Sequence, residues 1–275
     1  MVSYAHGADE SYRLDDELRF RERMGASAMA ERYISQIIRA YFPDRSPASI
    51  RVLDVGTGQG MAVKALRTLG YDAYGLEPGG RFSDVDEDVR PYVYRVFSHD
   101  LEKTHPEVEK FDLLFSNGVV EHVGTTDGNA DLVPDYIEYR NLFIESQLSL
   151  LKKDGILIVI GPNRLFPFDF QHGDHYYGFV QHLDGIPFLR HMTIPWHPRN
   201  HLCSYNDIRA IAERSGYGLE FIHITQEKYC SLTKLRNKPI LKSIFRSYVY
   251  AASLLPFQLR QFLEPHTIFV CRLVA

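Results

Sequence analysis

The stretch Val52-Leu-Asp-Val-Gly-Thr-Gly-Gln-Gly60 places three glycines at alternate positions directly after a short apolar run. A helical pattern begins at once, at Met61, and continues to Leu69. A strand that turns through glycines into a helix lets its backbone approach a ligand closely, and the helix N-terminus adds free N–H groups. Dinucleotide folds instead use G-x-G-x-x-G, whose third glycine would fall at Met61, so this spacing disfavours NAD and FAD.

The rest of the chain alternates between strand-like and helical segments. The predicted strands are 49–55, 72–77, 92–97, 111–117, 156–161, 218–225 and 266–274. Residues 1–48 form an N-terminal segment with helical spacing over 15–42, the longest later helix is expected over 134–151, and another should begin at Ser204, where Ser204 and Asp207 nearly form a capping box. Strands that alternate with helices indicate an α/β fold with a doubly wound, mostly parallel sheet.

Composition favours a single cytoplasmic domain over residues 1–275. The chain is 45% hydrophobic without a compositional break, and its net charge of −4 offers no bulk positive field for nucleic acid. Cys203, Cys230 and Cys271 lack CxxC spacing, which favours a reducing compartment and gives no thiolate zinc site. The polar N-terminus and the absence of about eighteen consecutive apolar residues indicate neither secretion nor membrane spanning.

Two segments depart from the alternation. Residues 164–200 are rich in Phe, Tyr, His, Pro and Gly without a clean period, and we interpret them as a substrate-facing aromatic and His-rich cap insertion. From Lys228 to Leu263 every charged residue is basic and apolar residues lie between them. This basic amphipathic segment could contact an anionic bilayer weakly, at the inner face of the membrane, or hold a phosphorylated lipid carrier. Alternatively, it is a helix packed on the core with a solvated basic face.

The run Leu53-Asp-Val-Gly-Thr-Gly-Gln-Gly60 resembles the first motif of the class I S-adenosylmethionine-dependent methyltransferases, and the resemblance extends with decreasing clarity over residues 50–225. It implies a Rossmann-like seven-stranded sheet, S-adenosyl-L-methionine as the cofactor and an enzyme of the EC 2.1.1 class. The cofactor-binding residues that it implies are Asp54, Gly56, Thr57, Gly58, Gly60, Glu77, Pro78, Asp100, Leu101 and Asn117.

Three carboxylates have specific expected roles. The resemblance implies that Asp54 orders the loop that receives the methionine part of the cofactor, although it could simply bond its own turn. Glu77 ends the second predicted strand beside the glycine loop, where one carboxylate can accept both ribose hydroxyls. Asp100 matches the family position that bonds the adenine amino group, and the alternative is a solvated loop carboxylate.

Methyl transfer is an in-line displacement that needs alignment, and a base only when the nucleophile carries a proton. His122, His201 and His175 are the candidate catalytic residues, because a near-neutral imidazole can accept a hydroxyl proton. The alternatives are that Glu121 and His122 only order their loop and that the others are ordinary loop histidines. The Asp/His pattern over 169–175 lacks the spacing of a compact metal site, so no metal is predicted.

The acceptor is expected to be a small molecule, with a hydroxyl of a sugar or lipid-linked glycan preferred because aromatic faces suit sugar rings. The stretch after residue 111 departs from the Asp/Asn-Pro-Pro-Tyr pattern of enzymes that methylate nucleic-acid bases, which again disfavours nucleic acid. Two alternatives stay open. The chain could methylate nitrogen or carbon of another metabolite, or it could be a non-catalytic, cofactor-binding scaffold subunit.

Overall fold

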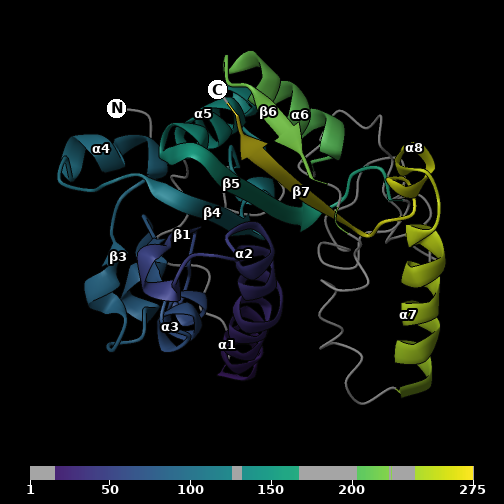
Figure 1. Ribbon diagram of the computed structural model, residues 1–275, viewed down its shortest axis with the longest axis horizontal. Coiled ribbons are helices and arrows are strands. Elements are labelled where there is room, and N and C mark those ends of the chain that lie inside the picture. The colour runs from purple at the N-terminus through teal and green to yellow at the C-terminus, as the bar shows by residue number, and fades with distance from the viewer. Residues whose placement is uncertain (1–15, 126–131, 167–202, 223, 225–238, 275) are drawn as a thin grey trace.

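The computed structural model describes residues 16–125, 132–166, 203–222, 224 and 239–274 (Figure 1). Most of the predicted cap insertion, the first part of the basic segment, His175, His201 and Cys230 lie outside these described residues.

The strands form one seven-stranded sheet in the order β3-β2-β1-β4-β5-β7-β6. They are β1 (Arg51–Val55), β2 (Asp72–Leu76), β3 (Val93–Tyr94), β4 (Phe111–Asn117), β5 (Leu151–Pro162), β6 (Leu219–Phe221) and β7 (His266–Leu273). The first five strands pair in parallel, and β7 runs antiparallel to both of its neighbours. The predicted doubly wound, mostly parallel sheet is therefore confirmed.

Three strands differ clearly in length from the prediction. Of the predicted strand 218–225, only Leu219–Phe221 form β6 among the described residues. The third predicted strand, 92–97, contains only the two residues of β3, because the chain turns at 98–100 into a 3-10 segment. The fifth begins at Leu151 rather than at 156, and its pairing with β4 shifts register between Phe111 and Leu113. Asp154, with φ 62°, is the residue that allows the early part of β5 to bend, since it occupies the left-handed region that Asp tolerates.

Helices cover both faces of the sheet (Figure 1). The helices are α1 (Asp16–Met29), α2 (Ser35–Tyr41), α3 (Met61–Thr68), α4 (Leu101–Thr104), α5 (Tyr136–Ser149), α6 (Tyr205–Arg214), α7 (Pro239–Ser253) and α8 (Phe257–Arg260). The helices α1, α2 and α3 lie on one face, while α4, α5 and α6 lie on the other. The helix predicted to begin at Ser204 is confirmed, with a complete capping box between Ser204 and Asp207.

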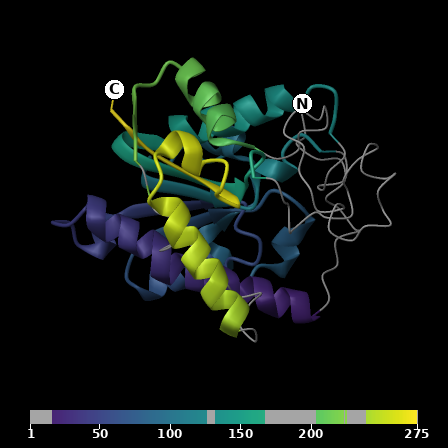
Figure 2. The same cartoon turned by 90° about the vertical axis from the view of Figure 1, so that its right-hand side faces the viewer.

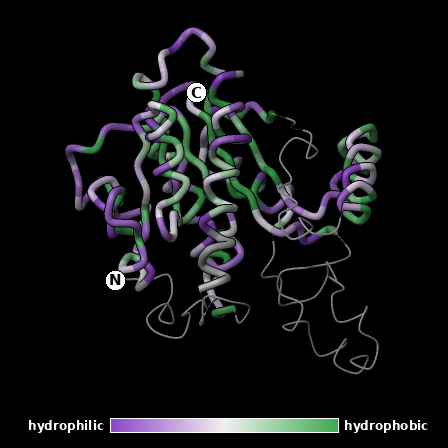
Figure 3. The backbone as a smooth tube through the Cα atoms, turned by 90° about the horizontal axis from the view of Figure 1, so that it is seen from below, coloured by the Kyte–Doolittle hydropathy of each residue, from purple (hydrophilic) through white to green (hydrophobic). Residues whose placement is uncertain are grey.

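The central strands are apolar on both faces because both faces are covered. In β4, Leu113 and Phe115 pack under α2 and α3, while Leu114 faces α5 and α6. All three are fully buried, and Figure 3 shows hydrophobic residues along the strands at the centre of the molecule. Strands buried on both sides therefore appear as continuous apolar runs rather than alternating ones.

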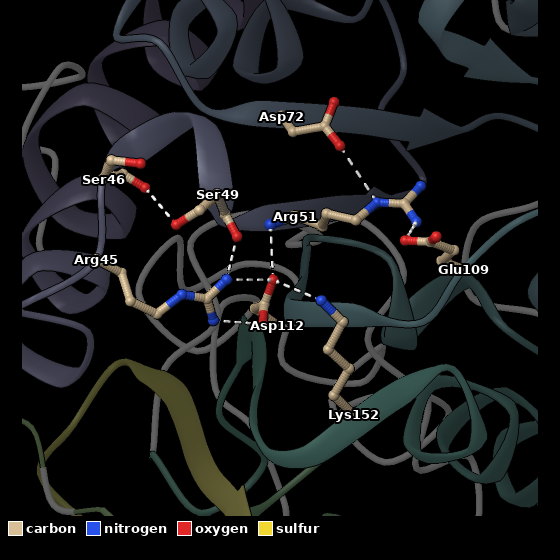
Figure 4. Close-up of polar contacts among 8 residues, drawn as sticks. All are labelled: Arg45, Ser46, Ser49, Arg51, Asp72, Glu109, Asp112 and Lys152. Atoms are coloured by element: carbon tan, nitrogen blue, oxygen red, sulfur yellow. Dashed lines mark hydrogen bonds and ion pairs between the residues drawn. The ribbon is translucent and has the colours of Figure 1, made fainter.

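A charged network ties the amino ends of the central strands together (Figure 4). The buried Asp112 carboxylate accepts from Arg45 Nη1 at 2.6 Å, the Arg51 backbone N–H at 2.8 Å and Lys152 Nζ at 3.1 Å. Burial alone would raise the pKa of Asp112, but these hydrogen bonds hold it below its ordinary value. The network joins β1, β4 and β5 at the edge of the sheet opposite the glycine loop.

The chain reaches its last strand through α7 and α8, which lie beyond the end of the sheet where β5 stops and β7 starts (Figures 1 and 2). Pairing of Pro162 with His266 marks this edge. Among the residues that the structure describes, no helix combines the length and apolar character needed to span a bilayer.

Candidate functional site

The glycine loop lies at the carboxyl edge of the sheet, where the strand order reverses between β1 and β4. Gly56, Gly58 and Gly60 have φ values of 77°, 56° and 77°, in the left-handed region that favours glycine. The N–H groups of Gly56 and Thr57 both donate to the Leu76 carbonyl at 2.9 Å, which attaches the loop to the end of β2. Open α/β sheets bind ligands at such a reversal point.

The three glycines are needed for different reasons. A Cβ atom on Gly56 would lie 2.6 Å from Val119 Cγ2, and one on Gly60 would lie 2.8 Å from Val89 Cγ2. A Cβ atom on Gly58 would meet only the flexible guanidinium of Arg81, at 3.6 Å. Gly56 and Gly60 therefore permit packing within the protein, whereas Gly58 leaves its backbone open to a ligand.

Glu77 points from the end of β2 toward this loop. Its Oε2 accepts the Gly58 backbone N–H at 2.8 Å, and the residue is 8% exposed. Burial raises the pKa of Glu77, and the Gly58 N–H, the Arg81 guanidinium and the Gly79 N–H oppose that rise. A buried carboxylate beside an open glycine backbone can accept hydrogen bonds from a ligand with paired hydroxyls.

Asp54 lies beneath the loop at the end of β1 and is buried. Burial raises the pKa of Asp54 to about 7, an effect that the neighbouring Thr57 hydroxyl partly offsets and the Glu77 charge reinforces. A negative charge on either carboxylate therefore disfavours ionisation of the other. Because burial places the pKa of Asp54 near neutrality, the charge beneath the loop depends on pH in that range.

Two arginines that the sequence analysis did not predict as site residues lie against the glycine loop. Arg81 lies over Gly58 and attracts the Glu77 carboxylate. Arg23, on α1, donates from Nε to Gln59 Oε1 at 2.5 Å, so the N-terminal helix contacts the glycine loop directly. Neither residue belongs to a local motif, and only the fold brings them to the site.

The other predicted cofactor residues lie around the same edge. Pro78 directly follows Glu77, and Asn117 is exposed at the end of β4. Asp100 begins α4, where its carboxylate pairs with Lys103 Nζ at 3.3 Å and His99 Nε2 at 3.2 Å. The Leu101 side chain is fully buried in the core, so only its backbone is available to a ligand.

After β4 the chain forms a 3-10 turn over Val120–His122. Glu121 is 1% exposed, and no hydrogen bond to its Oε2 exists within the described residues. A Cβ atom on Gly161 of β5 would lie 3.1 Å from that oxygen, which places Glu121 over the ends of β4 and β5. His122 is partly buried, and its carbonyl accepts the Thr125 hydroxyl at 2.8 Å. Of the three predicted catalytic histidines, His122 alone falls in the described chain.

The end of β5 carries a second polar group that the sequence did not predict. Arg164 donates Nε and Nη2 to the two oxygens of Asp207, at 3.0 and 2.6 Å, and so joins the strand end to α6. Cys203 is buried beside this pair, and burial raises the pKa of its thiol to about 11. Cys203 is therefore a poor nucleophile at neutral pH.

A separate cavity of about 500 Å³ lies on the face of the sheet that α4, α5 and α6 cover, between the 98–100 segment, α5 and α6. Its lining includes Ser98, His99, Glu145 and Arg214 and contains no residue of the glycine loop and not Glu77. The chemistry of the carboxyl edge, rather than this cavity, therefore identifies the candidate site.

Comparisons with known proteins identify the family of the chain. Residues 26–220 match a protein family described as a methyltransferase domain. A curated relative, the ubiquinone biosynthesis O-methyltransferase of Pelagibacter ubique (strain HTCC1062), is 27% identical over 142 residues. That match covers 48% of this chain and 52% of the relative, so the chain spans about half the length of that protein.

The fold resembles that of a solved methyltransferase structure. The plantazolicin methyltransferase BamL, determined with a desmethyl substrate analogue and S-adenosylhomocysteine, has a TM-score of 0.51 at 12% identity, covering 94% of this chain and 90% of that one. The sugar N-methyltransferase KedS8 from Streptoalloteichus sp. ATCC 53650 has a TM-score of 0.41 at 18% identity, over 58% of this chain and 56% of that one.

Proposed function

The chain belongs to the methyltransferase domain family, whose cofactor is S-adenosylmethionine. We therefore propose that it transfers a methyl group to a small-molecule acceptor. The observation that carries the proposal is the contact between Glu77 Oε2 and the Gly58 N–H at 2.8 Å, beside a face of Gly58 whose nearest neighbours among the described residues are atoms of the Arg81 guanidinium.

The residues present fit this cofactor. When bound, S-adenosylmethionine supplies a methyl group already activated by the positive sulfonium. Glu77 would accept the two ribose hydroxyls, and the open face of Gly58 would lie against the amino-acid part of the cofactor. Asp54 would hold the loop from below, since it is buried two residues before Gly56. The protein's main contribution is alignment.

We further propose that the acceptor atom is a hydroxyl oxygen, on a sugar or a lipid-linked glycan. Two observations support this choice. The curated relative is named as an O-methyltransferase, and the segment 164–200 is rich in aromatic residues that suit sugar rings. Loss of the hydroxyl proton would require a base, and His122 is the candidate, because it follows the end of β4 one turn from Asn117.

Binding and transfer test the proposal separately. Calorimetry with S-adenosylhomocysteine should show binding to the wild type, and absence of heat at high micromolar ligand would contradict the cofactor assignment and favour a scaffold role. Incubation with labelled S-adenosylmethionine and extracts of sugars, glycolipids and other metabolites should then label a product. If the labelled product withstands base and acid, as a methyl ether does, the result supports a hydroxyl acceptor. A product labelled on an amine would contradict a hydroxyl acceptor.

The His122→Ala variant separates catalysis from binding. We expect turnover to fall by about 10²-fold, the lower range for removal of a general base, while the affinity for S-adenosylhomocysteine stays within about twofold. The exposed His105, which contacts Glu107 at 3.3 Å away from the glycine loop, offers a matched control as His105→Ala. Full activity of His122→Ala would show that the base lies elsewhere or is not needed.

A further inference from the structure

Exposed apolar side chains concentrate in one short part of the molecule. Within the described residues, eight of the twelve exposed large apolar side chains fall between positions 239 and 263. They are Ile240, Leu241, Ile244, Tyr250, Leu254, Leu255, Leu259 and Phe262, and we name them the α7–α8 patch. Single exposed apolar residues are ordinary, but so many in one short stretch of the chain indicate an interaction surface.

The first two turns of α7 carry the most exposed part of this patch. Ile240 and Ile244 are 75% and 60% exposed and lie one turn apart, with Leu241, 50% exposed, beside them. Within α7 only Val249 and Ala252, both in its second half, are buried. Figure 1 shows α7 beyond the end of the sheet, with its first half at the end of the helix farther from β7.

The charge of this region identifies the kind of partner. Residues 239–263 contain no acidic residue, and Lys242 and Arg246 lie one turn apart on α7. The whole chain carries −4, so its basic apolar end contrasts with the rest of its surface. An apolar surface with local positive charge is complementary to an anionic bilayer, whereas a symmetric dimer through the same patch would bring like charges together.

The two bases lie on a different side of α7 from Ile240 and Ile244. A helix is about 10 Å wide, and the Debye length is about 10 Å at 0.1 M ionic strength. When the apolar side contacts lipid, Lys242 and Arg246 would therefore remain within the range of the anionic surface at moderate ionic strength. We propose that the α7–α8 patch docks the protein on an anionic membrane surface.

The patch is fixed to the edge of the sheet that carries the candidate site. Asn163, which follows β5, donates from Nδ2 to the Gln261 and Glu264 carbonyls at 2.7 and 2.8 Å. The buried Glu264 carboxylate accepts the Tyr205 hydroxyl at 2.7 Å. These bonds hold the chain after α8 against the end of β5 and the start of α6. Docking would therefore hold the carboxyl edge near the bilayer, and, if the proposed function holds, near an amphiphilic acceptor.

Co-sedimentation of the full chain with vesicles tests the proposal. With vesicles of phosphatidylcholine and phosphatidylglycerol in equal proportion, we expect the wild type to pellet at low ionic strength. Binding should weaken at about 1 M salt, where the Debye length is about 3 Å, and with phosphatidylcholine alone. Wild-type protein that stays in the supernatant with anionic vesicles at low ionic strength would overturn the proposal.

Variants locate the contact. Ile240→Ser with Ile244→Ser should weaken vesicle binding at least about tenfold, since each isoleucine loses an apolar contact, whereas Leu69→Ser with Ile137→Ser, which alters exposed residues elsewhere, should not. Lys242→Gln with Arg246→Gln should weaken binding to anionic vesicles by about twofold per base, less than for a base at the surface, because about one Debye length separates these bases from the lipid. Sedimentation velocity tests whether a second copy of the chain is the partner instead. A wild-type dimer that dissociates in the Ile240/Ile244 variant, without vesicle binding, would overturn the proposal.

This readout is independent of catalysis. Vesicle binding requires neither S-adenosylmethionine nor turnover, so failure of methyl transfer leaves it unaffected. Conversely, a protein that binds S-adenosylhomocysteine but no vesicles would refute the membrane surface and leave the proposed function intact.

Discussion

Replacing Glu77 by alanine should weaken the affinity for S-adenosylhomocysteine severely while the protein stays folded. The carboxylate is 8% exposed and accepts backbone hydrogen bonds from the Gly58 N–H, at 2.8 Å, and from the Gly79 N–H. A carboxylate has about four lone-pair sites, so it can still accept hydrogen bonds from a ligand with two neighbouring hydroxyls. The variant removes both of those bonds together with the negative charge.

The magnitude follows from the type of bond lost. A hydrogen bond to a charged group contributes about 1.5–3 kcal/mol, and the burial of Glu77 leaves little solvent to screen it. Two such bonds amount to about 3–6 kcal/mol, which corresponds to about 10²- to 10⁴-fold in the dissociation constant. Glu77→Gln keeps the shape and one acceptor oxygen, so its loss of affinity should be smaller than that of the alanine variant.

Burial also gives this site a pH dependence. Because the pKa of Glu77 is raised above its ordinary value of 4.5, the carboxylate becomes protonated at a higher pH than a solvated glutamate. Affinity for S-adenosylhomocysteine should therefore fall as the pH decreases through that raised pKa. In the Glu77→Gln variant this part of the pH dependence should be lost.

Calorimetry with S-adenosylhomocysteine measures the affinity, and thermal unfolding of the same samples measures stability. Glu138→Ala, which removes an exposed glutamate from α5, is the matched control and should bind as the wild type does. A Glu77→Ala variant whose dissociation constant rises less than about threefold would refute the role assigned to Glu77. An equal loss of affinity with an unfolded protein would be uninformative, and Glu77→Gln then supplies the test.

Three further predictions concern the loop and the buried thiol. Gly58→Ala should lower the affinity for S-adenosylhomocysteine at least about tenfold, and should cost only about 1–2 kcal/mol of stability for its φ of 56°. Gly56→Ala, whose Cβ would lie 2.6 Å from Val119 Cγ2, should lower the melting temperature by several degrees. Equal effects of the two variants on stability would contradict this assignment. The stability from protonated Asp54 is complete below the ordinary carboxyl pKa of 3.8 and is lost as the pH rises through about 7. Asp54→Asn should therefore flatten the fall in unfolding free energy between pH 4 and 8, measured in urea, and an unchanged slope would count against the raised pKa. Because burial raises the pKa of the Cys203 thiol to about 11, Cys203 should resist alkylation at pH 8 until urea unfolds the chain. Labelling of Cys203 in the native protein at the rate of a free thiol would contradict its burial.

Much of the fold could be predicted because its signals are local. The glycine run after β1, the helix from Met61 and the capping box at Ser204 each depend on residues within one or two turns of one another. The length of β3 was not predicted, because the apolar residues after Tyr94 pack against the core without forming a strand. The basic amphipathic segment was predicted over 228–263, with a helix packed on the core as one interpretation, but the bounds of α7 and the exposure of its first half were not predicted.

The sequence by itself determined the main strands and helices, a mostly parallel, doubly wound sheet and the carboxylate that follows β2. Only the tertiary structure decided that Gly58, and not Gly56 or Gly60, presents an open backbone face, because Val119 and Val89 come from later parts of the chain. It also decided that Arg23 contacts Gln59. The physical reason is that a pattern of neighbouring residues encodes local backbone geometry, whereas burial and contact between distant segments arise only when the whole core packs.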